Sequence, residues 1–439
     1  MSQNSRRNFL KSTGAAATAG LLVQTSGWAS PNDTINVGVV GIRGRGGSHV
    51  NGFANLDGVK VAALCDIDEN VLNQRAAGFM EDNKVSSDVS KYFDYREMIE
   101  DQELDAVSIA TPNHWHSLQG IWACQAGKDV YVEKPLSHNV LEGRKLVEAA
   151  RKYDRIVQHG TQIRSSAAVQ EAMEMLQNGE IGEVYYAKGT CYKWRDTIGN
   201  APVEPVPDGV HYNLWMGPAP EKPFTENRFH YDWHWQWDYG NGDIGNQGVH
   251  QMDVARWGLG VGLPNLASSI GGHFMFDDDQ ETPNTLVSTF KYNDSNQMLV
   301  FEVRHWITND ELNQGGTGNV VGNLFLGSEG MMIVPSYNSY QVYYGRQRRE
   351  GPSRSEGGNH YANFIEAMRK RDRSILNADV EEGHLSSALC HLANAAYRVE
   401  RTINFDPVSE QAIDDKEAND ILMGRDRGYR GDFELPENV

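Results

Sequence analysis

The sequence predicts two domains: an N-terminal α/β domain with a parallel sheet, and a C-terminal α+β domain with an open, mostly antiparallel sheet. The chain has 439 residues, more than one hydrophobic core usually supports. Its first part alternates β-branched runs with helical stretches, a pattern that builds a parallel sheet covered by helices. Later strands follow one another through Asn, Asp, Ser and Gly turns, as in antiparallel sheets.

The first 29 residues are predicted to be an export signal. Residues 5–11 read SRRNFLK and precede a mildly apolar segment at 14–23, and small residues follow near residue 29. This layout is typical of a removable signal peptide, and the run resembles the twin-arginine consensus at each position. The resemblance implies that the twin-arginine export machinery carries the folded protein to the periplasm. The alternative is a basic N-terminus that arose by chance.

Residues 30–161 are expected to form the parallel-sheet domain. Its predicted strands, each followed by a helix, are 35–40, 59–64, 104–110, 129–132 and 155–159.

Residues 162–439 are expected to form the second domain. After a helix at 165–178 and a strand at 184–192, an irregular region rich in Trp, Tyr, Pro and His extends to about residue 240. Late helices would connect elements or pack on the first domain, and the acidic C-terminal tail would be a surface strap. The remaining predicted strands are 284–292, 297–306, 322–326 and 331–334, and the late helices are 361–369 and 380–401.

Composition excludes several classes of partner. The net charge of -19, from 59 acidic and 40 basic residues, repels nucleic acid and anionic membranes, and favours a neutral or cationic small substrate. No apolar run of ~18 residues predicts a stable membrane anchor. The cysteines lack CxxC spacing, so we expect buried thiols and neither a metal site nor a disulfide framework. They are Cys65, Cys124, Cys191 and Cys390.

A glycine-rich turn follows the first predicted strand. In residues 41–47, GIRGRGG, glycines would let the backbone approach a pyrophosphate at the start of a helix, as in a Rossmann dinucleotide site. The spacing is imperfect, because the second glycine of a GxGxxG motif is replaced by arginine. Arg43 and Arg45 either bind the pyrophosphate or face solvent. The predicted cofactor-binding residues here are Gly41, Arg43, Gly44, Arg45 and Gly46.

Asp66 ends the second predicted strand. A carboxylate there can accept hydrogen bonds from ribose hydroxyls and would repel a 2′-phosphate, which favours NAD over NADP. Alternatively, Asp66 only caps the next helix. The nearby arginines leave NADP open.

Two further motifs follow predicted strands, at 111–116 (TPNHWH) and 133–135 (EKP). The carboxyl ends of parallel strands are where open α/β sheets bind ligands. Taken alone, Lys134 could be only a surface ammonium.

Together with 181–184 (IGEV) and 248–253 (GVHQMD), these motifs resemble the glucose–fructose oxidoreductase and inositol dehydrogenase (Gfo/Idh/MocA) superfamily, over nearly the whole mature chain. The resemblance implies a homo-oligomer, a dimer or tetramer. It implies that Lys134 lies beside the nicotinamide and helps to deprotonate the substrate hydroxyl, while His250 is the general acid/base. It also assigns Thr111, Asn113, His116 and Glu133, with Lys134, to the cofactor.

The chain departs from the family at Asn246, four residues before His250, where family dehydrogenases usually carry aspartate. An amide can orient the imidazole but does not stabilise imidazolium as a carboxylate does. Either His250 is a weaker base, or Asp243 substitutes, or the reaction differs from alcohol oxidation.

Aromatic residues suggest where a sugar binds. Five of the ten tryptophans lie between residues 194 and 237, and those at 233, 235 and 237 alternate as on one face of an extended segment. Flat rings stack on sugars, although a core or interface role is the alternative. Polar residues near these rings could bind hydroxyls: Tyr192, Lys193, Arg195, His230, Asp232 and His234. The predicted substrate-binding residues are Lys134, Trp194, Arg195, Trp235, Asn246 and His250.

Export narrows the function, because a periplasm without a free nicotinamide pool requires a bound cofactor. The leading hypothesis is an NAD(P)-dependent oxidoreductase acting on a CH–OH group of a sugar, glycoside or polyol. The second is an NAD-dependent glycoside hydrolase that works by transient oxidation, elimination, hydration and re-reduction, as some members of this superfamily do, with Tyr231 or Tyr239 as a possible base. The third is an inactive sugar-binding protein.

Overall fold

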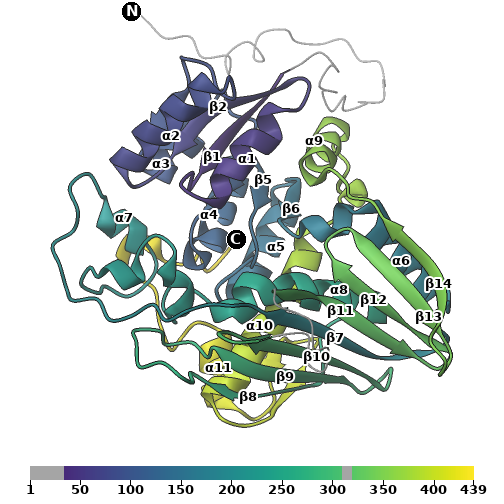
Figure 1. Ribbon diagram of the computed structural model, residues 1–439. Helices are drawn as coiled ribbons and strands as arrows, with labels where there is room; N and C mark the ends of the chain where they lie inside the picture. The colour runs from purple at the N-terminus through teal and green to yellow at the C-terminus, as the bar shows by residue number, and fades with distance from the viewer. Residues whose placement is uncertain (1–33, 309–318) are drawn as a thin grey trace, which may run out of the picture.

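The computed structural model describes residues 34–308 and 319–439, so the predicted export signal lies outside the described residues. The first domain contains a six-stranded parallel sheet in the order β3-β2-β1-β4-β5-β6 (Figure 1). Short buried runs rich in Val, Ala and Ile form its centre. The strands are β1 (Ile35–Val40), β2 (Val59–Cys65), β3 (Ser90–Tyr92), β4 (Ala106–Ile109), β5 (Asp129–Val132) and β6 (Val157–His159).

Helices connect these strands, and polar caps fix where several of them start. Asp68 and Asn139 accept hydrogen bonds from backbone N–H groups in the first turns of α2 and α5, which satisfies donors that have no partner inside the helix. The helices are α1 (Arg45–Ala54), α2 (Glu69–Glu81), α3 (Tyr95–Glu100), α4 (Asn113–Gln125) and α5 (Val140–Lys152).

The second domain contains a ten-stranded sheet in the order β14-β13-β12-β11-β7-β10-β9-β8-β15-β16. Its pairs are antiparallel except β7 with β10, which is parallel. Strand β9 alternates buried and less buried residues, as a sheet covered on one face requires. The strands are β7 (Val184–Tyr192), β8 (Leu266–Gly272), β9 (Thr285–Tyr292), β10 (Gln297–Arg304), β11 (Val320–Gly327), β12 (Gly330–Ser336), β13 (Ser339–Tyr344), β14 (Arg349–Ser355), β15 (Ile403–Asp406) and β16 (Gln411–Ala412).

Helices α6 (Ala167–Gln177), α8 (Val249–Leu259) and α10 (Val380–Arg398) share one large hydrophobic core with this sheet. Helix α10 also contacts α5 and β6, so it joins the two domains. Helix α9 (His360–Lys370) packs on the first domain through Phe364 and Ile365 (Figure 1). The predicted fold class is confirmed for both domains. The remaining short α-helices are α7 (Tyr212–Met216) and α11 (Lys416–Leu422).

One local expectation is wrong. The tryptophans near 235 do not lie on an extended strand, because residues Asp232–Trp235 form a turn of 3₁₀-helix. Trp233 and Trp235 are buried, whereas Trp237 packs near Tyr397 with its ring centre 6.4 Å from that of the tyrosine. The alternation of tryptophans therefore did not indicate a strand. Among the described residues, no strand pairs with this segment, and a segment without a partner does not form a sheet.

The C-terminal tail returns to the first domain. Phe433 is buried against Trp115, with ring centroids 5.4 Å apart and nearly perpendicular planes. Lys145 donates to the carbonyl of Glu437 at 2.7 Å, and Lys152 donates to the carbonyl of Val439. The tail thus supports the helix that carries Trp115.

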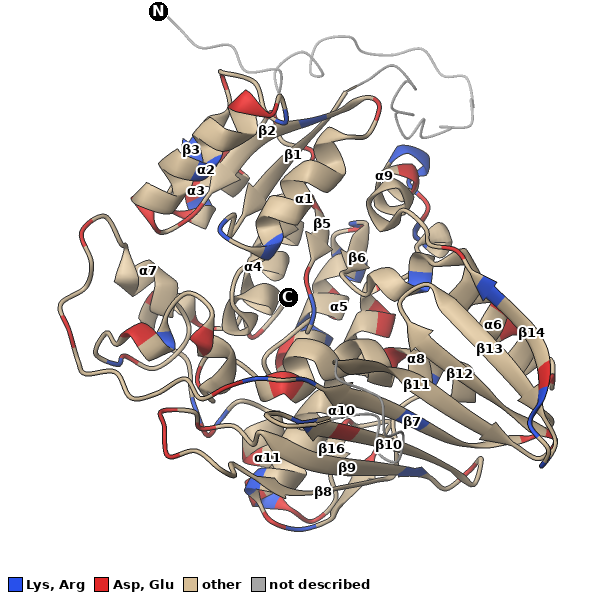
Figure 2. Cartoon of the chain, in the orientation of Figure 1, with Lys and Arg blue, Asp and Glu red and all other residues tan. Residues whose placement is uncertain are grey.

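Acidic and basic residues are spread over both domains rather than gathered on one of them (Figure 2).

Candidate active site

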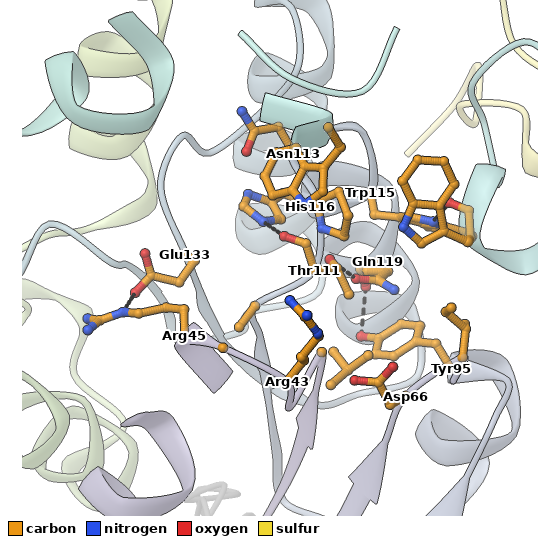
Figure 3. Close-up of a pocket in the computed structure, with 18 of the residues that line it drawn as sticks. Arg43, Arg45, Asp66, Tyr95, Thr111, Asn113, Trp115, His116, Gln119 and Glu133 are labelled. Atoms are coloured by element: carbon orange, nitrogen blue, oxygen red, sulfur yellow. Dashed lines mark hydrogen bonds and ion pairs between the residues drawn. The ribbon is translucent and has the colours of Figure 1, made fainter. Parts of the chain in front are cut away.

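A cavity of about 380 Å³ lies between the domains, at the carboxyl ends of the parallel strands. The first domain lines it with residues that follow each of the strands β1 to β5, and the second domain contributes residues 214, 215, 229–231, 233, 234 and 246. Figure 3 shows the side chains that surround this space on the first domain. Open α/β sheets bind their ligands at this edge.

The glycine-rich turn forms one wall. Gly41 has a φ of +79°, and a Cβ there would lie 2.6 Å from the carbonyl oxygen of Ala110. A Cβ on Gly46 would lie 2.2 Å from the carbonyl oxygen of Gly41, whereas a Cβ on Gly44 would meet no atom within 4 Å. The chain is therefore tightly wound at Gly41 and Gly46 and open at Gly44, next to the N-terminus of α1. This shape fits a pyrophosphate held by backbone N–H groups.

Asp66 lies at the end of β2 and lines the cavity. Its carboxylate accepts from the backbone N–H of Ile42 at 3.0 Å and from that of Asp68 at 3.2 Å. Asp68, not Asp66, caps α2, so the capping alternative is wrong. Burial raises the pKa of Asp66 to about 6.

The two arginines of the turn differ. Arg43 lines the cavity. Arg45 also lines it, but its Nε donates to Glu133 at 2.8 Å (Figure 3). The Arg45 guanidinium thus has a buried carboxylate partner, an arrangement that the sequence did not indicate.

Glu133 is buried and fixes the loop after β5. It accepts hydrogen bonds from His49 at 3.0 Å and Gln162 at 2.9 Å as well as from Arg45. Although burial opposes ionisation, Arg45 and the hydrogen bond from His49 keep the pKa of Glu133 well below its usual range. Glu133 is therefore an anion beside Lys134.

Side-chain hydrogen bonds also fix the loop after β4. Thr111 donates to Gln119 at 2.7 Å, and Asn113 donates to the side chain of Asn241 at 3.1 Å. The ring of His116 lies between the carbonyl oxygens of Thr111 and Pro135, at 2.7 and 2.6 Å. His116 thus connects the loops after β4 and β5, and Thr111, Asn113 and His116 all line the cavity.

Lys134 reaches from the first domain to the second. Its ammonium donates to the backbone carbonyl of Asn246 and to the side-chain Oδ1 of Asn246, the latter at 3.2 Å. Asn246 lies in one turn of π-helix, Ile244–Gly248, which precedes α8. Burial lowers the pKa of Lys134 to about 8, even though Glu133 opposes this change.

Asn246 also connects Lys134 to a buried ionic group. Its Nδ2 donates to Oδ1 of Asp243 at 3.1 Å. Asp243 accepts two bonds from Arg195, at 2.8 and 3.1 Å, and lies 2.8 Å from Nε2 of His305. Arg195 in turn donates to the hydroxyl of Tyr231 at 3.1 Å, which completes a hydrogen-bonded chain from the cavity residue Tyr231 to Lys134.

His250 is 4% exposed and is not among the residues that line the cavity. Its Nδ1 is buried without a hydrogen-bond partner in the described part of the chain, and its ring centre lies 5.1 Å from that of Tyr337. Burial and the charge of Lys134 hold the pKa of His250 well below its usual range. The hydrogen bonds of Asp243 described above go to residues other than His250, so none of them supports the alternative in which Asp243 substitutes for the missing aspartate.

Three predicted substrate residues, Trp194, Arg195 and Trp235, also lie outside the cavity lining. Trp194 is 53% exposed and donates to the carbonyl of Thr308 at 2.8 Å, and Trp235 is buried 4.9 Å from the Arg195 guanidinium. Other aromatic residues line the cavity instead, among them Trp115, Trp122, Trp215, Phe229 and Trp233. The sequence carried a signal for three of these, Trp115 in the motif at 111–116 and Trp215 and Trp233 in the tryptophan cluster, but none was among the predicted substrate residues.

Part of the irregular region packs on the loop after β2, next to Asp66, at one end of the cavity. The backbone N–H of Glu69 donates to the carbonyl of Gly209, and that of His211 donates to Ile67, each at 2.9 Å. The His211 ring stacks on Phe93 with centroids 5.1 Å apart. Residues 208–211, here called the docking segment, therefore cover the turn that follows Asp66.

A parallel sheet with an open glycine turn, an acid after β2 and a second domain closing the cavity define a two-domain, dinucleotide-binding protein. The comparisons with known proteins make this specific. Residues 35–161 match the model of the Gfo/Idh/MocA oxidoreductase family, NAD-binding Rossmann fold, and residues 166–320 and 337–433 match the C-terminal α/β domain of that family. The chain belongs to this family, as its motifs predicted.

Residues 3–23 match the signal sequence of the twin-arginine translocation pathway, which suggests export across the cytoplasmic membrane. Among the residues with described positions, no helix has both the length and the apolar character needed to span a membrane.

Curated relatives include glycosyl hydrolase family 109 proteins. Those of Shewanella baltica strain OS185 and Shewanella putrefaciens are 29% and 28% identical over 206 residues. Each alignment covers 42% of this chain and 45% of the relative, so the match spans less than half of either protein.

Among solved structures, levoglucosan dehydrogenase in complex with NADH and levoglucosan is 17% identical, with a TM-score of 0.65, and the alignment covers 85% of this chain and 99% of that one. The WlbA dehydrogenase of Bordetella pertussis, in complex with NADH and UDP-GlcNAcA, is 18% identical, with a TM-score of 0.62 and coverage of 85% and 99%. These similarities show the shared fold.

Proposed function

We propose that the protein is an NAD-dependent oxidoreductase that acts on a CH–OH group of a sugar, glycoside or polyol in the periplasm and keeps its cofactor tightly bound. The observation that carries this proposal is the position of Lys134. It is a half-buried amine with a pKa of about 8, at the junction of a dinucleotide-shaped cavity and the second domain. A group that titrates near the working pH is suited to exchange a proton with a hydroxyl.

The walls of the cavity suggest how the cofactor binds. The open backbone at Gly44 would hold the pyrophosphate, and Asp66 would accept from the ribose hydroxyls at the end of β2. Thr111, Asn113, His116 and Glu133 shape the remainder next to Lys134. When bound, NAD supplies the hydride acceptor. We propose NAD rather than NADP because the Asp66 carboxylate would repel a 2′-phosphate.

The chain's own contribution is to control a proton. The neutral amine of Lys134 can take the hydroxyl proton of the substrate, and Asn246 holds that amine in place with two oxygen atoms. Arg45 and His49 hold the anion of Glu133, which accepts from the backbone N–H of Lys134 at 3.2 Å and acts on the Lys134 amine through its charge.

Tight binding has structural support. The docking segment covers the turn after Asp66, and the C-terminal tail packs Phe433 behind the cavity residue Trp115. A cofactor enclosed in this way would survive export of the folded protein. The proposal keeps two further predictions. The export signal ends at residue 29 and the domain boundary follows residue 161, and the protein forms a homo-oligomer.

A second candidate is the NAD-dependent glycoside hydrolase, which the name of the glycosyl hydrolase family 109 relatives favours. It needs the same cofactor and the same hydroxyl oxidation as its first step. The two candidates differ in whether the cofactor, once reduced, would be reoxidised within the same turnover by returning its hydride to the sugar.

The deciding experiment is to purify the mature protein from the periplasm, denature it and determine by mass whether a dinucleotide is released. One NAD per chain supports the bound-cofactor proposal, whereas an empty protein that binds NAD weakly contradicts it. The loaded protein is then given monosaccharides, inositols and aryl glycosides. Reduced cofactor in proportion to product supports the dehydrogenase, release of aglycone without net reduction supports the hydrolase, and no turnover contradicts both.

A further inference from the structure

His234 is a cavity residue that the motifs did not indicate. It lies in the 3₁₀ turn Asp232–Trp235, and its ring is stacked on Trp233 with centroids 3.6 Å apart and planes 20° apart. This contact fixes the plane of the imidazole. Both His234 and Trp233 line the cavity, together with Lys134 and Asn246.

One ring nitrogen of His234 is already used. Nδ1 lies 2.6 Å from the carbonyl oxygen of Tyr231. A carbonyl only accepts hydrogen bonds, so Nδ1 must carry the hydrogen, and in the neutral ring Nε2 is then an acceptor. Among residues 34–308 and 319–439, none forms a hydrogen bond with Nε2 of His234.

The ring is neutral where Lys134 titrates. Burial lowers the pKa of His234 to about 3, and the charges of Lys134 and Arg195 act in the same direction, against Asp243. Protonated Lys134 therefore lies close enough to affect the ring electrostatically. His234 is an acceptor beside the residue that exchanges the proton, and it does not itself store that proton.

The contrast with His250 is clear. His250 is buried outside the cavity lining, with Nδ1 unbonded and its ring against Tyr337. Of these two histidines, only His234 combines a fixed tautomer with a place on the cavity wall.

We propose that Nε2 of His234 binds the substrate directly, accepting the hydrogen of one sugar hydroxyl while the amine of Lys134 takes the proton of the neighbouring hydroxyl. This inference rests on the proposed function. It assigns His234 to substrate recognition: the acceptor requires an O–H at that position and disfavours a sugar that carries an ether or no group there. A polar site that loses its partner in this way discriminates more strongly than an apolar pocket does.

The test uses the full mature protein with its dinucleotide, labelled with ¹⁵N in its histidine rings. The signal of His234 is assigned by its loss in His234→Gln. We expect Nδ1 to be protonated and Nε2 to be unprotonated between pH 6 and 9. Addition of D-glucose, methyl β-D-glucoside or myo-inositol at high concentration should move the Nε2 signal toward that of a hydrogen-bonded nitrogen. A hydrogen on Nε2, or no movement with any of these sugars, overturns the proposal.

Variants supply a second readout. His234→Phe keeps the ring on Trp233 but removes the acceptor, so sugar binding measured by calorimetry should weaken about tenfold, the equivalent of one hydrogen bond. His234→Gln, which offers an amide oxygen, should recover part of the affinity. His273→Phe is the matched control, because His273 lies in a second-domain loop outside the cavity lining.

Dinucleotide content identifies variants that have failed to fold. Unchanged sugar affinity in a loaded His234→Phe protein overturns the proposal. If sugars move the Nε2 signal of the wild type but are not converted, His234 binds the sugar as proposed, and it is the proposed enzymatic function that fails.

Discussion

Asn246 holds Lys134 with two acceptors, its backbone carbonyl and its side-chain Oδ1, where the family usually places a carboxylate. Burial lowers the pKa of Lys134 to about 8, and the neutral amide adds no charge to oppose this. A carboxylate at the same position would favour the ammonium and raise this pKa. The neutral side chain therefore keeps more of the amine unprotonated at neutral pH.

The first prediction concerns Asn246→Asp. Oxidation requires the neutral amine, so activity should rise with pH through the pKa of Lys134. In Asn246→Asp that rise should move to higher pH by about one unit or more, because the new carboxylate stabilises the ammonium. The measurement is kcat/KM against pH for both proteins. Since the new charge faces Asp243, the variant should also have a lower Tm.

Asn246→Ala is the control for that shift. It removes one acceptor and adds no charge, while the backbone carbonyl still holds Lys134. Its pH profile should stay near that of the wild type, and an equal shift in both variants would contradict the electrostatic explanation.

The second prediction concerns Lys134→Met, which keeps an unbranched apolar stem and removes the amine. If Lys134 exchanges the proton of the hydroxyl, turnover should fall by about 10²- to 10⁴-fold, the usual contribution of general acid–base catalysis. Dinucleotide released on denaturation should remain near one per chain. A variant that keeps more than a tenth of wild-type turnover would exclude Lys134 from the proton transfer.

The third prediction concerns the pH dependence of cofactor affinity. The folded pKa of Asp66 is about 6, above its usual value, so the carboxylate is ionised above this pH and protonated below it. Because the ionised form accepts the ribose hydrogen bonds, NAD affinity should fall as the pH decreases through about 6. Titration by calorimetry between pH 5 and 8 tests this.

Asp66→Asn gives the comparison for the third prediction. It removes the titration and the repulsion of a 2′-phosphate, so the pH dependence should flatten and the preference for NAD over NADP should decrease by about tenfold or more. A preference that stays unchanged would show that another group selects the cofactor.

The sequence predicted most of the fold. Where an apolar run is long enough and a helical pattern follows it, the run indicates a strand of a buried parallel sheet. It did not predict β3, β8, β13, β14, β15 or β16. Of these, β3, β14 and β16 are edge strands, and β3, β15 and β16 have four residues or fewer, too short for a clear pattern. Motifs placed Lys134 and Asp66 correctly at strand ends. Distant partners could not be predicted, since the pairing of Arg45 with Glu133 and of Arg195 with Asp243 depends on how loops from different elements meet.

The aromatic residues that line the cavity could not be predicted from the sequence for the same reason. Trp194 and Trp235 were predicted to bind the sugar because tryptophans cluster in this part of the sequence. In the structure Trp194 is exposed, and Trp235 is buried beneath Arg195. The sequence named His234 only as one of several polar residues near the tryptophans that could bind hydroxyls, and gave no means of choosing among them. The tautomer on which its proposed role depends is set by the backbone carbonyl of Tyr231, which no side-chain motif encodes.

The last prediction separates cofactor binding from folding at the glycine turn. Gly44→Ala adds a methyl group that meets no protein atom within 4 Å, so its Tm should fall by less than that of a variant whose new methyl group clashes. The same methyl group would extend into the space assigned to the pyrophosphate, and NAD affinity should fall by about tenfold or more.

Gly46→Ala is the contrasting variant, because its Cβ would lie 2.2 Å from the carbonyl oxygen of Gly41. That clash must move the turn, and overpacking of this kind costs about 1–3 kcal/mol, so both Tm and affinity should drop. Scanning calorimetry of the dinucleotide-free proteins, followed by NAD titration, distinguishes the two effects. If Gly44→Ala binds NAD as the wild type does, the pyrophosphate does not lie against this turn, and the proposed cofactor position is wrong.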